Sequence, residues 1–235
     1  SGRTIDTFVY DLTQTPTANN FGNFTYTNMD EFKASSFGAD TIPAFVNYVE
    51  GIYVGYKFYE TAAAEGLIDY DKTVVYPFGR GLSYTTFTQT LNSVTEADGT
   101  ITVDVTVTNT GSASGKEVVE VYYNPPYTNG GIEKASANLI GFAKTSELAP
   151  GASENVTVTF RAEDMASYDT YGKGCYVLEK GDYVISINAD SHTVLDSKVY
   201  NVASDIVYDA SNKRESDVEV ADNKFDFAEG NVTYL

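Results

Sequence analysis

The sequence predicts a mainly β protein built around an antiparallel β-sandwich. From about residue 87 the apolar residues recur with a period of two, most clearly at residues 101–107, where Ile or Val alternates with Thr or Asp. Turn-forming pairs such as Asp98-Gly99 and Pro150-Gly151 separate these stretches, and no helix-length pattern lies between them. Together these observations favour a sandwich of the immunoglobulin-like or fibronectin III-like type.

The first 86 residues show weaker periodicity. Residues 4–9 could form a short strand, and residues 13–23 are typical of a loop. Apolar residues near helical spacing, followed by three alanines at 62–64, predict a short helix over residues 53–65. Gly51 and Gly55 weaken this prediction, because each glycine costs about 1 kcal/mol in a helix interior.

Seven strands are expected in the central part, and Asp98-Gly99 joins the first two as a tight hairpin. The expected strands are residues 88–94, 101–107, 117–123, 138–142, 155–160, 183–188 and 193–200. After residue 203 the chain becomes polar and charged. We therefore divide it into a segment 1–86, a sandwich 87–203 and a polar linker 204–235 toward a further domain.

Composition excludes several classes of function. The 235 residues carry a formal net charge of −18, which disfavours nucleic acid and anionic membrane surfaces as partners. One histidine and one cysteine cannot supply a Cys/His metal cluster, and we expect neither a metal nor a cofactor. No stretch approaches the roughly 18 apolar residues of a membrane span. The sequence leaves the compartment open, with a cytoplasmic, bacterial protein as our expectation.

Few residues are candidates for chemistry. His192 is expected in a surface turn, and Cys175 is expected to be half-buried and inert. Glycoside hydrolysis needs two carboxyl groups, and Asp6, Asp11 and Glu50 are the acids best surrounded by aromatic residues. A hydrogen-bonded polar group at a domain edge explains each of these acids equally well.

Three stretches resemble the family 3 glycoside hydrolases, which include many β-glucosidases. Residues 1–7 look like a segment that closes a strand of their α/β sandwich domain, and residues 48–59 are similar to their Glu-Gly-Ile stretch, with Lys57 where Arg is common. Residues 77–87, Pro-Phe-Gly-Arg-Gly-Leu-Ser-Tyr-Thr-Thr-Phe, match the stretch that leads into their fibronectin III-like domain. The resemblance implies that residues 1–86 are the C-terminal part of an α/β sandwich domain.

The resemblance also implies that the catalytic carboxylates are elsewhere. The family's nucleophile is an aspartate on a TIM barrel, typically followed by Trp, and this chain has no Trp. The acid/base glutamate lies upstream of the stretch that matches residues 1–11. We therefore predict no catalytic residue here, with Glu50 and Asp6 as candidates for ordering a substrate.

The implied function is a non-catalytic structural portion of a retaining β-glycosidase, whose partners are the parent's TIM-barrel and α/β sandwich domains and a β-glucoside or oligosaccharide substrate. Residues 222–226 and 232–235 look like the lead-in to a barrel that follows the sandwich. The alternative is a carbohydrate-binding or adhesive sandwich, in which exposed tyrosines such as Tyr122, Tyr123 and Tyr127 would stack on sugar rings.

Overall fold

A computed structural model describes residues 2–18, 24–25, 44–45 and 50–219. The N-terminal part holds β1 (Phe8–Val9), η1 (Leu12–Gln14), β2 (Phe24–Thr25), β3 (Ala44–Phe45), α1 (Tyr56–Ala64), α2 (Tyr70–Thr73) and β4 (Val74–Tyr76). The remainder holds β5 (Phe87–Ala97), β6 (Thr100–Asn109), β7 (Val118–Asn124), β8 (Asn138–Lys144), β9 (Ser153–Arg161), η4 (Ala162–Met165), β10 (Ser167–Tyr168), β11 (Tyr176–Leu178), β12 (Gly181–Asn188), β13 (Val194–Val202) and β14 (Ile206–Tyr208).

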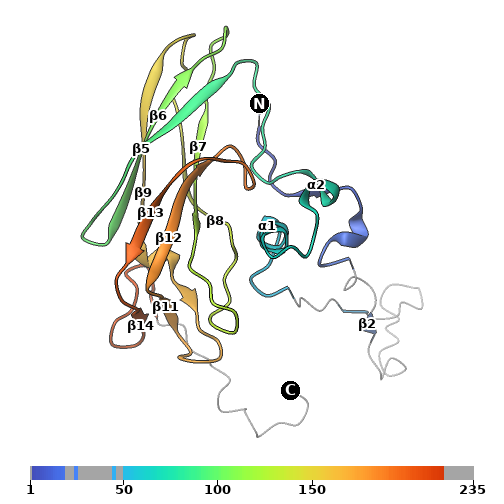
Figure 1. Cartoon of the computed structure of the whole chain (residues 1–235), viewed down its shortest axis with the longest axis vertical. Coiled ribbons are helices and arrows are strands. Elements are labelled where there is room, and N and C mark those ends of the chain that lie inside the picture. The colour runs from blue at the N-terminus through green and yellow to red at the C-terminus, as the bar shows by residue number, and fades with distance from the viewer. Residues whose placement is uncertain (1, 19–23, 26–43, 46–49, 220–235) are drawn as a thin grey trace, which may run out of the picture.

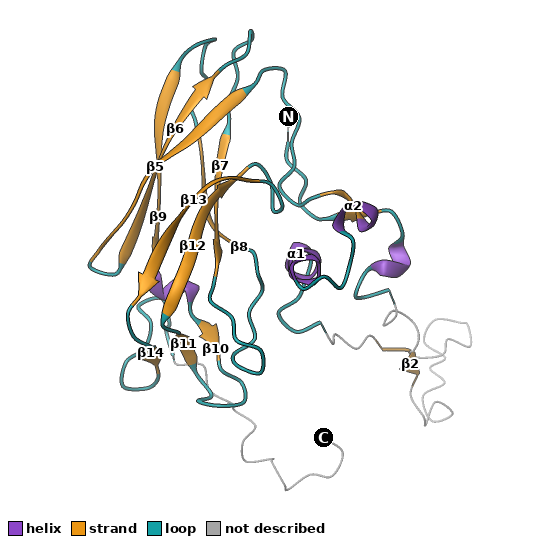
Figure 2. Ribbon diagram, viewed as in Figure 1, coloured by secondary structure: helices purple, strands orange, loops and turns teal. Residues whose placement is uncertain are grey.

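The central part is an antiparallel β-sandwich, as predicted. One sheet has the strand order β13-β12-β7-β8 and the other the order β5-β6-β9 (Figure 1). The predicted hairpin joins β5 to β6, with Ala97 opposite Thr100. Asp98 and Gly99 both have positive φ angles, 51° and 74°, as a two-residue type I′ turn requires. A small third sheet, β10-β11-β14, closes one end of the sandwich (Figure 2).

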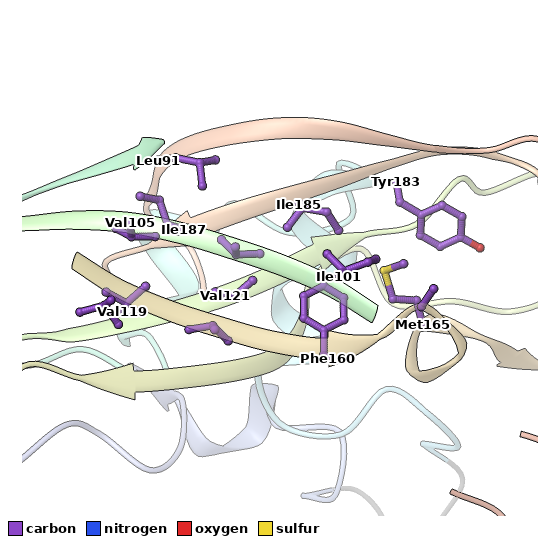
Figure 3. Close-up of a cluster of buried hydrophobic side chains, with 14 of the residues drawn as sticks. Leu91, Ile101, Val105, Val119, Val121, Phe160, Met165, Tyr183, Ile185 and Ile187 are labelled. Carbon is purple, nitrogen blue, oxygen red and sulfur yellow. The ribbon is translucent and has the colours of Figure 1, made fainter. Parts of the chain in front are cut away.

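The two large sheets enclose the hydrophobic core (Figure 3). On β6 the residues predicted to face inward, Ile101 to Val107 in alternation, are 0% exposed. Val119 and Val121 of β7 and the isoleucines of β12 meet them from the opposite sheet. Burial of each such side chain contributes about 1.5–3 kcal/mol, so this core is the main source of stability in the sandwich.

The N-terminal part lies against the outer face of the sheet β13-β12-β7-β8. The Tyr56 hydroxyl of α1 accepts a hydrogen bond from the Leu139 backbone N–H of β8 at 2.9 Å, and its ring meets that of Tyr122 edge to face. The predicted helix is confirmed. It begins at Tyr56 because Gly55, with φ of +61°, occupies the N-cap position. The strand expected at residues 4–9 is limited to Phe8–Val9, which pair with β4.

The chain continues to interact with the sandwich beyond residue 203. Ile206–Tyr208 form β14 and pair with β11 in an antiparallel register. Arg214 then lies over the ring of Tyr176 at 3.6 Å and binds Asp217 at 2.7 Å. This part of the expected linker is therefore anchored to the fold. Residues 222–226 and 232–235, which resemble the lead-in to a barrel, lie outside the described residues, and the domain limits stay a prediction.

Candidate functional site

Arg3 joins the N-terminal part to the sandwich. Its Nη1 donates hydrogen bonds to the backbone carbonyl of Gly79, at 2.9 Å, and to that of Ala189 in the β12–β13 turn. Its Nη2 forms a salt bridge with the carboxylate of Glu117, and its Nη1 lies 3.6 Å from Glu120 Oε1. One guanidinium thus joins its own segment to three others that are far apart in the sequence, at residues 79, 117–120 and 189.

Glu120 is a buried carboxyl group at this junction. Tyr122 donates its hydroxyl to Glu120 Oε2 at 3.1 Å. Burial raises the pKa of Glu120 to about 7, and the positive charge of Arg3 and the hydrogen bond from Tyr122 oppose that rise. Gly79 packs directly on the Glu120 carboxylate. A side chain would not fit at this position, since its Cβ would lie 2.5 Å from Glu120 Oε2.

A second polar cluster lies between α1 and the β12–β13 turn. The buried carboxylate of Glu60 accepts hydrogen bonds from the Tyr70 hydroxyl at 2.7 Å and the Ser191 hydroxyl at 2.9 Å. His192 Nδ1 lies 2.8 Å from Glu60 Oε2, and the imidazole stacks on the Tyr70 ring with centroids 3.6 Å apart. Burial raises the pKa of Glu60, and the hydrogen bonds from His192 and Tyr70 act against that rise.

The chemistry of this cluster is limited by its geometry. Nucleophilic catalysis needs a hydroxyl bonded to the imidazole that removes its proton. Ser191 instead directs its hydroxyl to Glu60, the group that the imidazole itself binds. The arrangement therefore holds two parts of the chain together and does not form a nucleophile–base pair.

His192 lies where the sequence places it but has partners that the sequence does not indicate. It does lie in a turn between two strands, as predicted, and its side chain is 44% exposed. Its ring also stacks on Tyr70, and its Nδ1 contacts Glu60. No local pattern in the sequence signals the contact between positions 60 and 192, because they lie 132 residues apart.

The structure brings Asp6 and Glu50 together in one pocket of about 500 Å³. Both carboxylate oxygens of Glu50 are buried and have no hydrogen-bond partner among the described residues. Asp6 is exposed and accepts the Thr7 backbone N–H at 2.8 Å. Asp11 is not part of this pocket. It caps η1, where the Thr13 hydroxyl and N–H hydrogen bonds hold the pKa of the carboxyl below its usual range.

The tyrosines considered for sugar stacking are not equally available. Tyr122 is 1% exposed, because α1 covers its ring and its hydroxyl is engaged by Glu120, so the expectation that it is exposed is wrong. Tyr123 packs against the core, and Tyr127 is exposed. Cys175 is also more buried than expected, and burial raises the pKa of its thiol.

Two kinds of feature are absent from the part of the chain that the structure describes. It contains no group of three or more His, Cys, Asp or Glu side chains that could hold a metal ion. Within the same residues, no helix has the length and apolar character needed to cross a membrane.

The sandwich is similar to a known domain family. Residues 117–191 match the family model for the fibronectin type III-like domain. The chain contains this domain. β-Glucosidase A of Butyrivibrio fibrisolvens is 42% identical over 157 residues, a match that covers 59% of this chain and 18% of the relative.

Two solved structures extend the similarity beyond the fibronectin type III-like domain. β-Glucosidase 3B of Thermotoga neapolitana, in complex with α-D-glucose, superposes with a TM-score of 0.70 at 31% identity. The match covers 88% of the present chain and 25% of the T. neapolitana chain. The GH3 β-glucosidase of Bifidobacterium adolescentis superposes with a TM-score of 0.65 at 27% identity. This match covers 84% of the present chain and 25% of the B. adolescentis chain. The chain thus resembles the family 3 β-glucosidases, and it spans less than a fifth of the length of the B. fibrisolvens relative.

Proposed function

We propose that this chain is a non-catalytic, structural portion of a family 3 β-glycosidase. Residues 1–86 complete an α/β sandwich domain, and the fibronectin type III-like domain supports that domain from one side. The parent protein hydrolyses β-linked glucosides with two carboxyl groups that its other domains supply, and a glycosyl-enzyme intermediate gives retention of configuration.

The observation that carries this proposal is the polar junction between the two parts. Arg3 and Glu60 belong to the N-terminal part, and each binds groups of the sandwich through its charged side chain. Removing one partner leaves the other group without compensation, and the cost falls as the pair becomes more exposed, so it should be larger at Arg3 than at the half-exposed His192. Such a junction supports a fixed orientation of the two parts.

Hydrolysis of p-nitrophenyl β-D-glucoside tests whether the catalytic carboxyl groups lie outside this chain. We expect no turnover by the 235-residue chain and measurable turnover by the full-length parent protein. Turnover by the chain alone, or its absence from the folded parent, would contradict the proposal.

The junction is tested in the parent with Arg3→Met. The variant should lower the melting temperature, while kcat/KM per folded molecule stays unchanged. Arg80→Met is the matched control, since Arg80 is exposed and lies over the Tyr76 ring without a salt bridge to the sandwich among the described residues. Equal effects of the two substitutions would show that Arg3 has no special structural role.

We propose further that Glu50 and Asp6 help to order a substrate of the parent. Their shared pocket and the buried Glu50 oxygens, which lack a partner among the described residues, support this role, because sugar hydroxyls are hydrogen-bond donors to carboxylates. Glu50→Gln in the parent should lower kcat/KM for the glucoside with little change in melting temperature. A parallel loss of stability and turnover would instead assign Glu50 to packing.

A further inference from the structure

A groove of about 720 Å³ with a mixed polar and apolar lining lies between α1 and the outer face of the sheet β13-β12-β7-β8. Its space exists because small side chains meet there from both sides. Ala63 and Ala64 line it from the helix, and Ser186 and Ser197 line it from paired positions on β12 and β13. Protein interiors are normally filled to crystal-like density, so a contact between small residues leaves room for a ligand.

Hydroxyl and amide groups lie among apolar and aromatic side chains in the lining of the groove. The polar uncharged residues are Asn124, Ser136, Ser186, Asn188, Ser191 and Ser197, and they come from the β7 and β12 strands, their loops and β13. Such groups both donate and accept hydrogen bonds, which is the pattern that a polyhydroxylated molecule presents in return.

Asn188 is a second, independent observation at the groove, because its buried amide oxygen is unpartnered within the described part of the chain. The residue is 2% exposed and lines the groove, yet its Oδ1 has no hydrogen-bond partner among the described residues. Turning the amide over would place an unpaired donor there instead of an acceptor. A buried polar atom without a partner costs about 1–3 kcal/mol, and a bound hydroxyl group would recover part of this cost.

Charge narrows the class of ligand. Glu60 is the carboxylate in the lining, and it already accepts hydrogen bonds from Tyr70 and Ser191 and binds His192. It is therefore not free to bind a cation. Among the described residues the lining contains no lysine or arginine, and the chain carries a net charge of −18, which opposes the binding of an anion.

We propose that this groove binds a neutral mono- or disaccharide. The ligand lies across the Ser186–Ser197 pair, within reach of Asn188 and beside the stacked rings of Tyr70 and His192. This site goes beyond the structural role proposed above. It is separate from the pocket of Asp6 and Glu50, with which it shares none of its described lining residues.

Isothermal titration calorimetry of the 235-residue chain with D-glucose and cellobiose tests the proposal, with inorganic phosphate as the charged comparison. We expect saturable binding of at least one sugar in the millimolar range and none of phosphate. Absence of saturable binding by both sugars overturns the proposal, and so does equal binding of phosphate.

Ser197→Tyr tests the location, because Ser197 is exposed on β13 and a tyrosine there would occupy the groove. We expect at least a tenfold loss of affinity. Thr90→Tyr is the matched control, since it places the same side chain at an exposed strand position outside the groove and should leave affinity unchanged. Equal affinities in the two variants would place the sugar elsewhere and overturn the proposal.

Asn188→Leu separates binding from stability. The substitution removes the unpaired amide at similar volume, so the melting temperature should stay the same or rise, while sugar affinity falls about tenfold. Retained affinity in the folded variant contradicts the role of Asn188. If the variant does not fold, Ser197→Tyr and its control decide the outcome.

Discussion

The sandwich and the N-terminal part of the chain are stabilised in different ways. The sandwich has a core of its own, in which the inward residues of β6 are fully buried. In the N-terminal part, by contrast, Ile5 is 90% exposed and Leu12 is 77% exposed. The contacts that join this part to the sandwich include the polar groups of Arg3 and Glu60 and the ring of Tyr56 against Tyr122. One region is therefore stabilised by its own core and the other by attachment to that region.

The largest effect should come from the core. Ile101→Ala removes a fully buried side chain from β6 and should lower the free energy of unfolding by about 4 kcal/mol. Ile5→Ala makes the same chemical change in the N-terminal part, and we expect a loss of about 0.5 kcal/mol or less. Urea unfolding followed by circular dichroism measures both. Similar losses would remove the difference between the regions.

The next effect tests the junction. Gly79 has φ of +82°, and Gly130 has φ of +81° but no described atom within 4 Å of the position that a Cβ would take. Alanine at either site costs about 1–2 kcal/mol through backbone strain. Gly79→Ala should cost about 1–2 kcal/mol more, since its methyl group meets Glu120. Equal losses of unfolding free energy in the two variants, measured by urea unfolding, would show that the Glu120 side chain moves away from the added methyl group at little cost.

Glu120 should make stability depend on pH. Its folded-state pKa of about 7 is raised above the unfolded value, so the folded protein binds the extra proton and loses stability as pH rises from about 4.5 to 7. Glu120→Gln removes this dependence. Relative to the wild type, the variant should gain on the order of 2 kcal/mol between pH 5 and pH 8.

The control for this profile is Glu147→Gln, which changes an exposed glutamate outside the junction. We expect its stability to follow the wild-type curve over the whole range. A Glu120→Gln curve parallel to that of the wild type would contradict the assignment of the buried proton.

The smallest effect concerns His192. His192→Phe keeps an aromatic ring against Tyr70 but removes the hydrogen bond to Glu60. Because the side chain is 44% exposed, we expect a loss of about 1 kcal/mol or less at pH 7. Thermal unfolding measures it, and His192→Ala should cost more because the stacking is lost as well. The reverse order would mean that the stacked rings contribute nothing.

The fold was predictable where a pattern lies within one element. Alternation identified β6, and Asp98-Gly99 identified the hairpin, because both depend on neighbouring residues. The strands β10, β11 and β14 have two or three residues each, too few to show a period.

The site was less predictable, because it depends on contacts between distant positions. Asp6 and Glu50 stand out in the sequence by their aromatic surroundings, and they do share a pocket, while their role stays a prediction. The pairing of Glu60 with His192 joins residues 132 positions apart, and nothing local signals it. The same holds for Arg3 and Glu117, which are 114 positions apart.

The position of β13 has a consequence for self-association. This strand is the outermost of its sheet, and its exposed face carries Val194, Leu195 and Val199. A free edge of this kind is a template for pairing with another copy, and Lys198 together with the chain's strong negative charge opposes such pairing. Near the isoelectric point of about 4.2 that repulsion disappears. Mild acid should therefore have two opposite effects. Protonation of Glu120 favours the folded molecule, while the loss of net charge makes folded molecules more prone to aggregate.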